Sequence, residues 1–198
     1  MKIYFLSATF AAYIFSFAAA GSPDSGNQAP TTTVFRDSVI SKIPSTNEML
    51  TEILATLGLQ QNFELKEAKV ANIEASISHR KRYILYNPEY IKWINGVTKD
   101  KWAAMALLAH EIGHHLNGHT IRRSGSKPAL ELEADEFAGF VLKKMGASLS
   151  EAQQVMKYIA KSKGSKTHPG RLLRMSAIKK GWNRASDTAG IGTASKRK

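Results

Sequence analysis

A histidine–glutamate–histidine pattern is the feature of the sequence best suited to carry out chemistry. Residues 110–114 read HEIGH. Because side chains four residues apart lie on one face of a helix, His110 and His114 can present two imidazoles to one metal ion. Glu111 follows the first histidine and can reach a water molecule on that metal. The pattern therefore predicts a metal site with a carboxylate placed to act as a general base.

The residues before the pattern favour this interpretation. Residues 102–109 read WAAMALLA, which is apolar on most sides and indicates a buried helix. Two imidazoles and a carboxylate on a buried helix would cost free energy without a metal ion. The motif also arises by chance, and the alternative is a pair of surface histidines on an amphipathic helix. The apolar context and a downstream acidic segment favour the metal site.

A catalytic zinc ion needs a third protein ligand, and one candidate is a further histidine. His119 is out of register with the extended motif HExxHxxGxxH, because Thr120 stands where that motif has its third histidine. A separate metal-binding pair of His115 and His119 is disfavoured, since Gly118 is expected to end the helix between them. No glutamate follows His115 either.

The acidic segment ELEAD at residues 131–135 offers the better candidate. Glu131 and Asp135 are four residues apart and share a helix face, whereas Glu133 points away from both. If the loop 118–127 folds this helix against the first, Glu131 completes a His₂Glu site. Asp135 then lies one turn further on, where it can hydrogen-bond and orient a ligand histidine. Glu133 as the ligand, or a solvated acidic patch at a helix N-terminus, are the alternatives.

A histidine and an arginine near the C-terminal end complete the set of candidates. His168 lies in the segment THP, and Arg174 follows six residues later. Both side chains can polarise a carbonyl and bind the oxyanion of a tetrahedral intermediate. An ordinary loop histidine and a surface arginine on an amphipathic helix explain the same residues equally well.

The elements that position these residues follow from sequence periodicity. Ser45 and Glu48 have the spacing of a capping box and predict a helix that Gly58 ends. Apolar residues then alternate with polar ones, including Ile73, Ala75 and Ile77 and then Tyr83 and Leu85. This alternation predicts two or three strands within residues 62–86, with Asn87-Pro88 ending the last. Four helices are expected to follow, spanning Thr98 to Gly118, Pro128 to Gly146, Ser148 to Gly164 and Pro169 to Gly181. The predicted fold class is α+β, mostly helical with a small antiparallel or mixed sheet.

The chain of 198 residues is expected to form one folded domain, at residues 35–182. Residues 1–20 have the short positive start, apolar stretch and alanine-rich end of a signal peptide, so export is expected. An uncleaved N-terminal anchor is the alternative, and it is the one membrane association that we expect. Residues 21–34 read as a flexible leader and residues 183–198 as a disordered basic tail.

Composition limits the kinds of site and partner. The sequence has no cysteine, so any metal must be held by histidine and carboxylate ligands. The formal net charge of +12 can steer a protein to anionic partners. The basic residues are spread along the chain, however, and we expect no nucleic-acid partner. The sequence does not indicate the oligomeric state.

Three segments together carry a family resemblance. HEIGHH, ELEADEFAG and THPGRLLRM occur in this order within about residues 70–182. In this respect the chain resembles the gluzincin zinc metallopeptidases, and particularly the group of the CAAX prenyl protease, the heat-shock protease HtpX and their soluble relatives. The resemblance implies a zincin-like domain in which the HExxH helix packs against the ExxxD helix. It also implies one Zn²⁺ per chain, a peptide or protein substrate, and an edge strand that binds the substrate backbone, for which residues 71–77 are the candidate.

The resemblance also implies roles for individual residues. It assigns the zinc ligands to His110, His114 and Glu131, the catalytic base to Glu111, support of the site to Asp135, and transition-state stabilisation to His168 and Arg174. Membrane-embedded members carry several transmembrane helices, for which this chain has no further candidate segment, so CAAX processing is not expected. A small exported zinc metalloendopeptidase is the resulting expectation. The alternative is a non-catalytic metal-containing binding or chaperone-like protein of the cell envelope.

Overall fold

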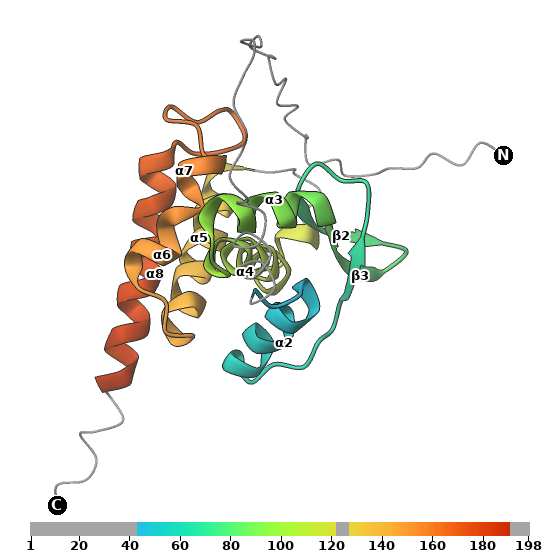
Figure 1. The fold of residues 1–198 in the computed structure, drawn as a ribbon, viewed down its shortest axis with the longest axis horizontal. Helices are drawn as coiled ribbons and strands as arrows, with labels where there is room; N and C mark the ends of the chain where they lie inside the picture. The colour runs from blue at the N-terminus through green and yellow to red at the C-terminus, as the bar shows by residue number, and fades with distance from the viewer. Residues whose placement is uncertain (1–42, 122–126, 191–198) are drawn as a thin grey trace, which may run out of the picture.

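The computed structural model describes residues 43–121 and 127–190 (Figure 1). The predicted signal peptide and leader, residues 1–34, lie outside the described residues. The elements are α2 (Thr46–Leu57), β1 (Glu64–Glu67), β2 (Ile73–Ser78), β3 (Lys81–Tyr86), α3 (Pro88–Thr98), α4 (Trp102–Leu116), the 3₁₀ helix η1 (His119–Ile121), α5 (Pro128–Lys144), α6 (Leu149–Gln154), α7 (Met156–Ile159) and α8 (Arg171–Gly190). The α+β class is confirmed.

The sheet is small and mixed, as predicted. Its strand order is β1-β3-β2, with β1 parallel and β2 antiparallel to β3. Ala75 of β2 faces Ile84 of β3, and both side chains are buried. The buried residues of β3 are Ile84 and Tyr86, so Tyr83 and Leu85 of the predicted alternation do not form the core face. Strand β2 forms an edge of this sheet.

A two-residue turn joins β2 to β3. Its residues, His79 and Arg80, both have a positive φ, of 48° and 66°. Two-residue hairpin turns of this kind match the twist of the strands but favour asparagine and glycine. The turn therefore holds His79 and Arg80 in a backbone conformation that residues with a side chain rarely adopt. The turn lies at the tip of the hairpin that includes edge strand β2.

One helix was not predicted. Helix α3 begins after Asn87, whose side chain accepts hydrogen bonds from the backbone N–H groups of Glu89 and Tyr90. The Asn87-Pro88 pair therefore ends the strand and also starts a helix, because proline is favoured at the first helical position. Thr98 is the last residue of α3 and does not cap α4. The carboxylate of Asp100 instead accepts from the backbone N–H of Trp102, the first residue of α4.

The helices after α4 follow the prediction in order but not in all their limits. Helix α5 begins at Pro128 as expected, and Ser148 with Glu151 forms the predicted capping box of α6. The third predicted helix is divided into α6 and α7 and ends at Ile159 rather than near Gly164. Helix α8 continues to Gly190, so residues 183–190 are helical and do not belong to a disordered tail.

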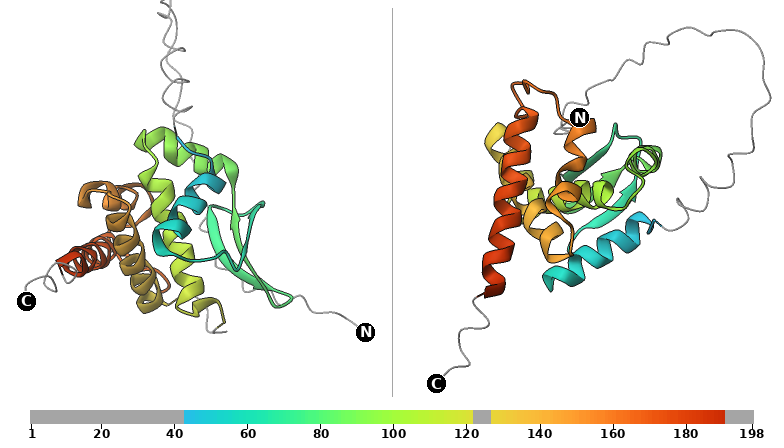
Figure 2. Two further views of the ribbon diagram at one scale, coloured as in Figure 1. Left: turned by 90° about the horizontal axis from the view of Figure 1, so that it is seen from below. Right: turned by 60° about the vertical axis from the view of Figure 1, so that its left-hand side comes forward.

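Helix α4 forms the centre of the domain. It packs against β2 and β3 on one side and against α5 on the other, and α8 lies against α5 (Figure 2). Its residues from Ala103 to Ala109 are all buried, which explains their apolar composition. The apolar run thus holds residues 110–114 between the sheet and α5. Within the described residues, no helix combines the length and apolar character needed to cross a membrane.

Candidate metal centre

Three side chains from α4 and α5 converge at one point. The Nε2 atoms of His110 and His114 lie 3.0 Å apart. Glu131 Oε2 lies 3.5 Å from His110 Nε2, and Glu131 Oε1 lies 3.6 Å from His114 Nε2. All three residues are buried. The packing of α5 against α4 therefore brings Glu131 to the two histidines, as the sequence predicted.

The spacing of these atoms suits a small metal ion. Ligand atoms at zinc bond lengths in a tetrahedral site lie roughly 3.3–3.4 Å apart, and the three observed separations bracket this value. Two imidazoles and one carboxylate form a donor set that zinc favours. Within the described part of the chain, His110, His114 and Glu131 form the one group of three or more such residues that could hold a metal ion.

A close contact between α4 and α5 sets this geometry. Gly113 lies on α4 immediately before His114 and faces α5. A Cβ atom at this position would lie 3.0 Å from the ring of Phe137 and 3.3 Å from the Cα atom of Ala134. The absence of a side chain thus lets the two backbones approach, and Glu131 can reach the histidines from the facing helix.

Asp135 lies where the sequence predicted and orients the first ligand. Its Oδ1 atom is 2.9 Å from His110 Nδ1, the ring nitrogen that faces away from the other ligands. The Nε and Nη2 atoms of Arg174 each donate to Asp135, both at 2.7 Å. Asp135 and Arg174 are buried. The structure therefore places the buried guanidinium of Arg174 against Asp135, on the side away from the candidate ligand atoms of His110 and Glu131.

The charges around His110 decide where protons reside in the metal-free protein. Burial disfavours the charged imidazolium of His110, but the hydrogen bond and charge of Asp135 outweigh it and raise its pKa to about 10. Burial and the charge on His110 lower the pKa of His114 to about 3. Burial raises the pKa of Asp135, yet Arg174 and His110 together hold it below its usual value. Binding a metal ion must therefore displace a proton from His110.

Glu111 lies between the metal ligands and the sheet. Its Oε2 atom accepts a hydrogen bond of 2.6 Å from the backbone N–H of Ala75, on edge strand β2. Burial raises the pKa of Glu111 to about 7, although the positive charge on His110 opposes the rise. A carboxylate with a pKa near neutrality is well suited to accept and return a proton. The predicted base thus faces both the metal ligands and the edge strand.

His168 approaches the same point from the segment between α7 and α8. Its Nε2 atom is 3.8 Å from Glu131 Oε2, and its Nδ1 atom is 2.9 Å from the hydroxyl of Thr167. The side chain of His168 is 38% exposed, whereas that of Glu131 is 3% exposed. His168 therefore lies at the solvent side of the ligand group, where it can meet a substrate.

Two further residues lie beside this group: His119, whose register disfavoured it as a ligand, and Glu133, the alternative acidic ligand. His119 Nδ1 is 3.0 Å from His114 Nδ1, and His119 Nε2 is 2.9 Å from the carboxylate of Glu133. Neither His119 nor Glu133 contributes to the group of candidate ligands. The spacing of the sequence did not predict that His119 contacts His114 or that Glu133 contacts His119.

His115, the other histidine weighed as a ligand, belongs to the core. Its Nε2 atom is 2.9 Å from the carbonyl oxygen of Tyr83, and its Nδ1 atom is 3.2 Å from the hydroxyl of Thr120. Its ring stacks on Phe63 with the centroids 5.6 Å apart. These contacts tie α4 to the sheet and engage both ring nitrogens of His115.

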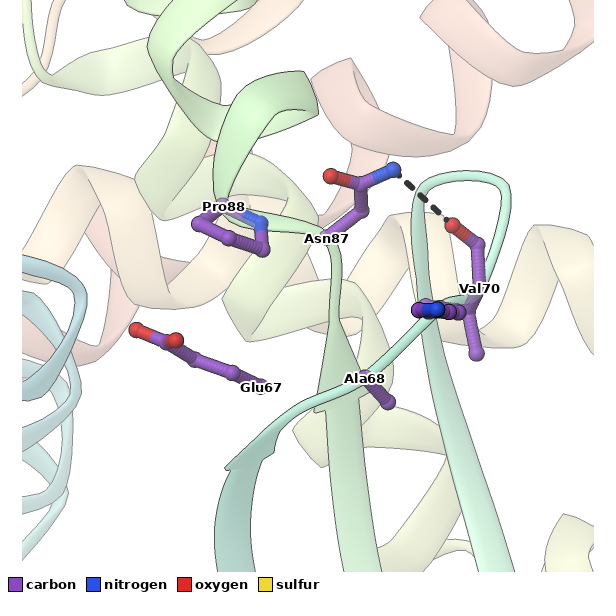
Figure 3. A pocket seen from close by; sticks show the side chains of 6 residues that line it. Glu67, Ala68, Val70, Asn87 and Pro88 are labelled. Carbon is purple, nitrogen blue, oxygen red and sulfur yellow. Dashed lines mark hydrogen bonds between the residues drawn. The ribbon is translucent and has the colours of Figure 1, made fainter.

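A separate pocket lies where strands β1 and β3 end (Figure 3). It is lined by Glu67, Ala68, Lys69, Val70, Asn87 and Pro88. The side-chain amide of Asn87 donates to the carbonyl oxygen of Val70 at 3.1 Å, which fixes one wall. The residues that line this pocket include none of the candidate metal ligands.

Comparison with known proteins assigns no relative. No protein-family model matches the chain, and no curated protein or solved structure matches it.

Proposed function

We propose that this protein is a zinc-dependent metalloendopeptidase of the gluzincin type. The observation that carries the proposal is the convergence of His110, His114 and Glu131 with the carboxylate of Glu111 beside them. The ligands are buried, and Glu111 reaches the edge of the sheet. A buried His₂Glu donor set with an adjacent general base suits hydrolysis by an activated water.

Each chain residue has a distinct task in this proposal. A bound zinc ion would polarise the scissile carbonyl and lower the pKa of an attacking water. Glu111 accepts the proton of that water and delivers one to the leaving amine nitrogen. Its pKa of about 7 lets it act in both directions near neutral pH. General acid–base help of this kind typically contributes ~10²–10⁴-fold to the rate.

The substrate backbone is proposed to pair with the edge of strand β2. The backbone N–H of Ala75 points out of the sheet toward Glu111, so this edge borders the metal centre. An extended peptide added to the edge would receive main-chain hydrogen bonds, with little dependence on its sequence. On binding, it would compete with Glu111 for the N–H of Ala75 and so release the carboxylate for catalysis.

His168 is proposed to stabilise the oxyanion of the tetrahedral intermediate. Its partly exposed ring lies beside the ligand group and can donate from Nε2 toward a substrate oxygen. We assign Arg174 a supporting role, because its guanidinium is held by Asp135. The chain of contacts from Arg174 through Asp135 to His110 keeps the first ligand oriented.

Cleavage of casein by the purified protein tests this function. We expect the zinc-loaded protein to cleave casein, and Glu111→Gln to abolish cleavage while it keeps the metal and the fold. Asn95→Ala, which changes a buried residue on α3 away from the metal centre, controls for a general loss of stability. A fully active Glu111→Gln protein would refute the proposed mechanism. A protein that binds zinc, yet cleaves no peptide, would instead support the non-catalytic binding protein.

We also propose that the protein acts outside the cytoplasm. The proposal rests on the signal-like character of residues 1–20. Mass spectrometry of the N-terminus in membrane and soluble envelope fractions tests it. A mature chain beginning after residue 20 is expected, whereas an intact N-terminus in the membrane fraction would indicate the anchored alternative.

A further inference from the structure

The two candidate histidine ligands are supported in different ways. His110 makes a direct contact with a carboxylate, since its Nδ1 atom lies 2.9 Å from Asp135. The Nδ1 atom of His114 meets a second imidazole, that of His119, at 3.0 Å. The far nitrogen of His119 then lies 2.9 Å from Glu133. Helix α5 thus supplies an acid to each histidine, directly at His110 and through His119 at His114.

The position of His119 depends on a chain reversal directly after α4. Helix α4 ends at Leu116, and Gly118 adopts a φ of 70° before η1 begins at His119. Glycine adopts this left-handed conformation without steric cost. The reversal returns His119 beneath the last turn of α4, where its ring is buried and its centroid lies 5.0 Å from that of His114. Glu133 reaches it from α5 with a side chain that is 57% exposed.

The contacts from His114 through His119 to Glu133 allow one placement of the ring protons in which His114 can bind a metal ion. When His114 Nε2 offers its lone pair to a metal, the ring proton must reside on Nδ1. His114 Nδ1–H then donates to His119 Nδ1, which must be unprotonated. His119 consequently carries its proton on Nε2 and donates it to the carboxylate of Glu133. In this arrangement, the His114–His119 and His119–Glu133 contacts each have one donor and one acceptor.

We propose that His119 is a positioning residue that fixes the tautomer and ring orientation of His114, with Glu133 as its anchor. This inference rests on the proposed metal site. The imidazole of His119 does not touch the metal or the substrate; it keeps His114 Nε2 unprotonated and directed at the other ligands. Removing such partners of metal ligands typically costs 10–100-fold in metal affinity.

Zinc affinity measured by competition with a chromophoric chelator tests the proposal on the full-length protein. We expect His119→Phe, which keeps a ring but has no nitrogen, to weaken zinc binding by about 10–100-fold. His119→Asn retains an acceptor near the Nδ1 position and should recover part of that loss. His115→Phe is the matched control, because it removes a neighbouring buried histidine whose partners among the described residues are Tyr83 and Thr120. It should leave the affinity within about twofold of wild type.

Nitrogen-15 NMR of the histidine rings measures proton exchange at His114 Nδ1. This exchange would not change if His119 only stabilised the fold. In the zinc-loaded wild type, the Nδ1–H proton of His114 should be visible and slow to exchange with water. His119→Phe should speed its exchange, while His115→Phe should not. If His119→Phe does not fold, His119→Asn and Glu133→Ala are compared instead, and wild-type affinity in both would overturn the proposal.

The outcomes separate this inference from the function on which it rests. Weaker binding in His119→Phe with partial recovery in His119→Asn supports the positioning role. Unchanged affinity in a folded His119→Phe protein refutes that role and leaves the metal site intact. A wild-type protein without zinc affinity refutes the metal site, and the inference with it.

Discussion

Replacement of Gly181 with alanine tests how the fold holds the metal centre. Gly181 lies inside α8 where this helix crosses α5. A Cβ atom there would overlap the carbonyl oxygen of Glu136 and lie 2.7 Å from its carbonyl carbon and 2.9 Å from the backbone nitrogen of Phe140. Real Cβ atoms essentially never approach other atoms within 3.0 Å. Because the opposing atoms belong to a helix backbone, no side-chain rotation relieves the clash and the helices must separate.

The magnitude follows from two opposing effects. Overpacking of this kind usually costs 1–3 kcal/mol. Alanine is favoured over glycine inside a helix by about 1 kcal/mol, which offsets part of that cost. We therefore expect Gly181→Ala to lower the free energy of unfolding by up to about 2 kcal/mol. Separation of α5 from α8 should also lengthen the contact between Asp135 and Arg174, so zinc affinity should fall with stability.

Urea unfolding followed by circular dichroism measures the change. Gly96→Ala is the matched control, because Gly96 is an exposed glycine of helix α3 with no atom within 4 Å of an added Cβ. It should raise the free energy of unfolding by about 0.5–1 kcal/mol. If Gly181→Ala raised the free energy of unfolding as much as Gly96→Ala, the close approach of the α5 and α8 backbones at Gly181 would be contradicted.

Three further predictions concern charge and backbone conformation. Since the pKa of His110 is raised to about 10 when folded, its stabilisation is complete below pH 6.5 and is lost as the pH rises. Chelator-treated protein should therefore lose up to roughly 1.4 kcal/mol per pH unit between pH 6.5 and 9 in urea titrations, and rising stability would contradict this. Asp135→Ala should cost about 3–5 kcal/mol by the same assay, because it leaves Arg174 buried without its carboxylate. If the free energy of unfolding of Asp135→Ala were within 1 kcal/mol of wild type, the Asp135–Arg174 pair would contribute little to stability. Arg80→Gly should raise the thermal midpoint, with a gain of about 1 kcal/mol, because glycine relieves the positive φ in the hairpin turn. A lower midpoint would exclude strain at this turn.

The sequence was most informative where a helical period defined the geometry. The spacing of His110 and His114 places both rings on one face of any helix, so their convergence did not depend on the rest of the fold. Glu131 and Asp135 have the same spacing, and their roles required only that α5 pack against α4. Helix caps at Ser45 and Ser148 were equally local and were predicted correctly.

The sequence was least informative where a residue's partner is distant in the chain. Arg174 was expected to face a substrate because its type suits an oxyanion, yet its partner Asp135 lies 39 residues away. His119 was judged by the register of a ligand motif, whereas its role depends on a reversal at Gly118 and on Glu133 of another helix. Asn87 and Pro88 were interpreted only as the end of a strand. Proline is compatible with a strand end and also with the first position of a helix, which is its place in α3.

Metal content of the purified protein shows whether His110, His114 and Glu131 hold a metal ion. We expect about one zinc ion per chain by inductively coupled plasma mass spectrometry after incubation with zinc and removal of the excess. Glu131→Ala should lose that zinc and Glu111→Gln should keep it, because Glu131 belongs to the ligand group and Glu111 does not. Wild-type protein that retains no metal, or Glu131→Ala protein that retains as much as wild type, would contradict the assignment of the site.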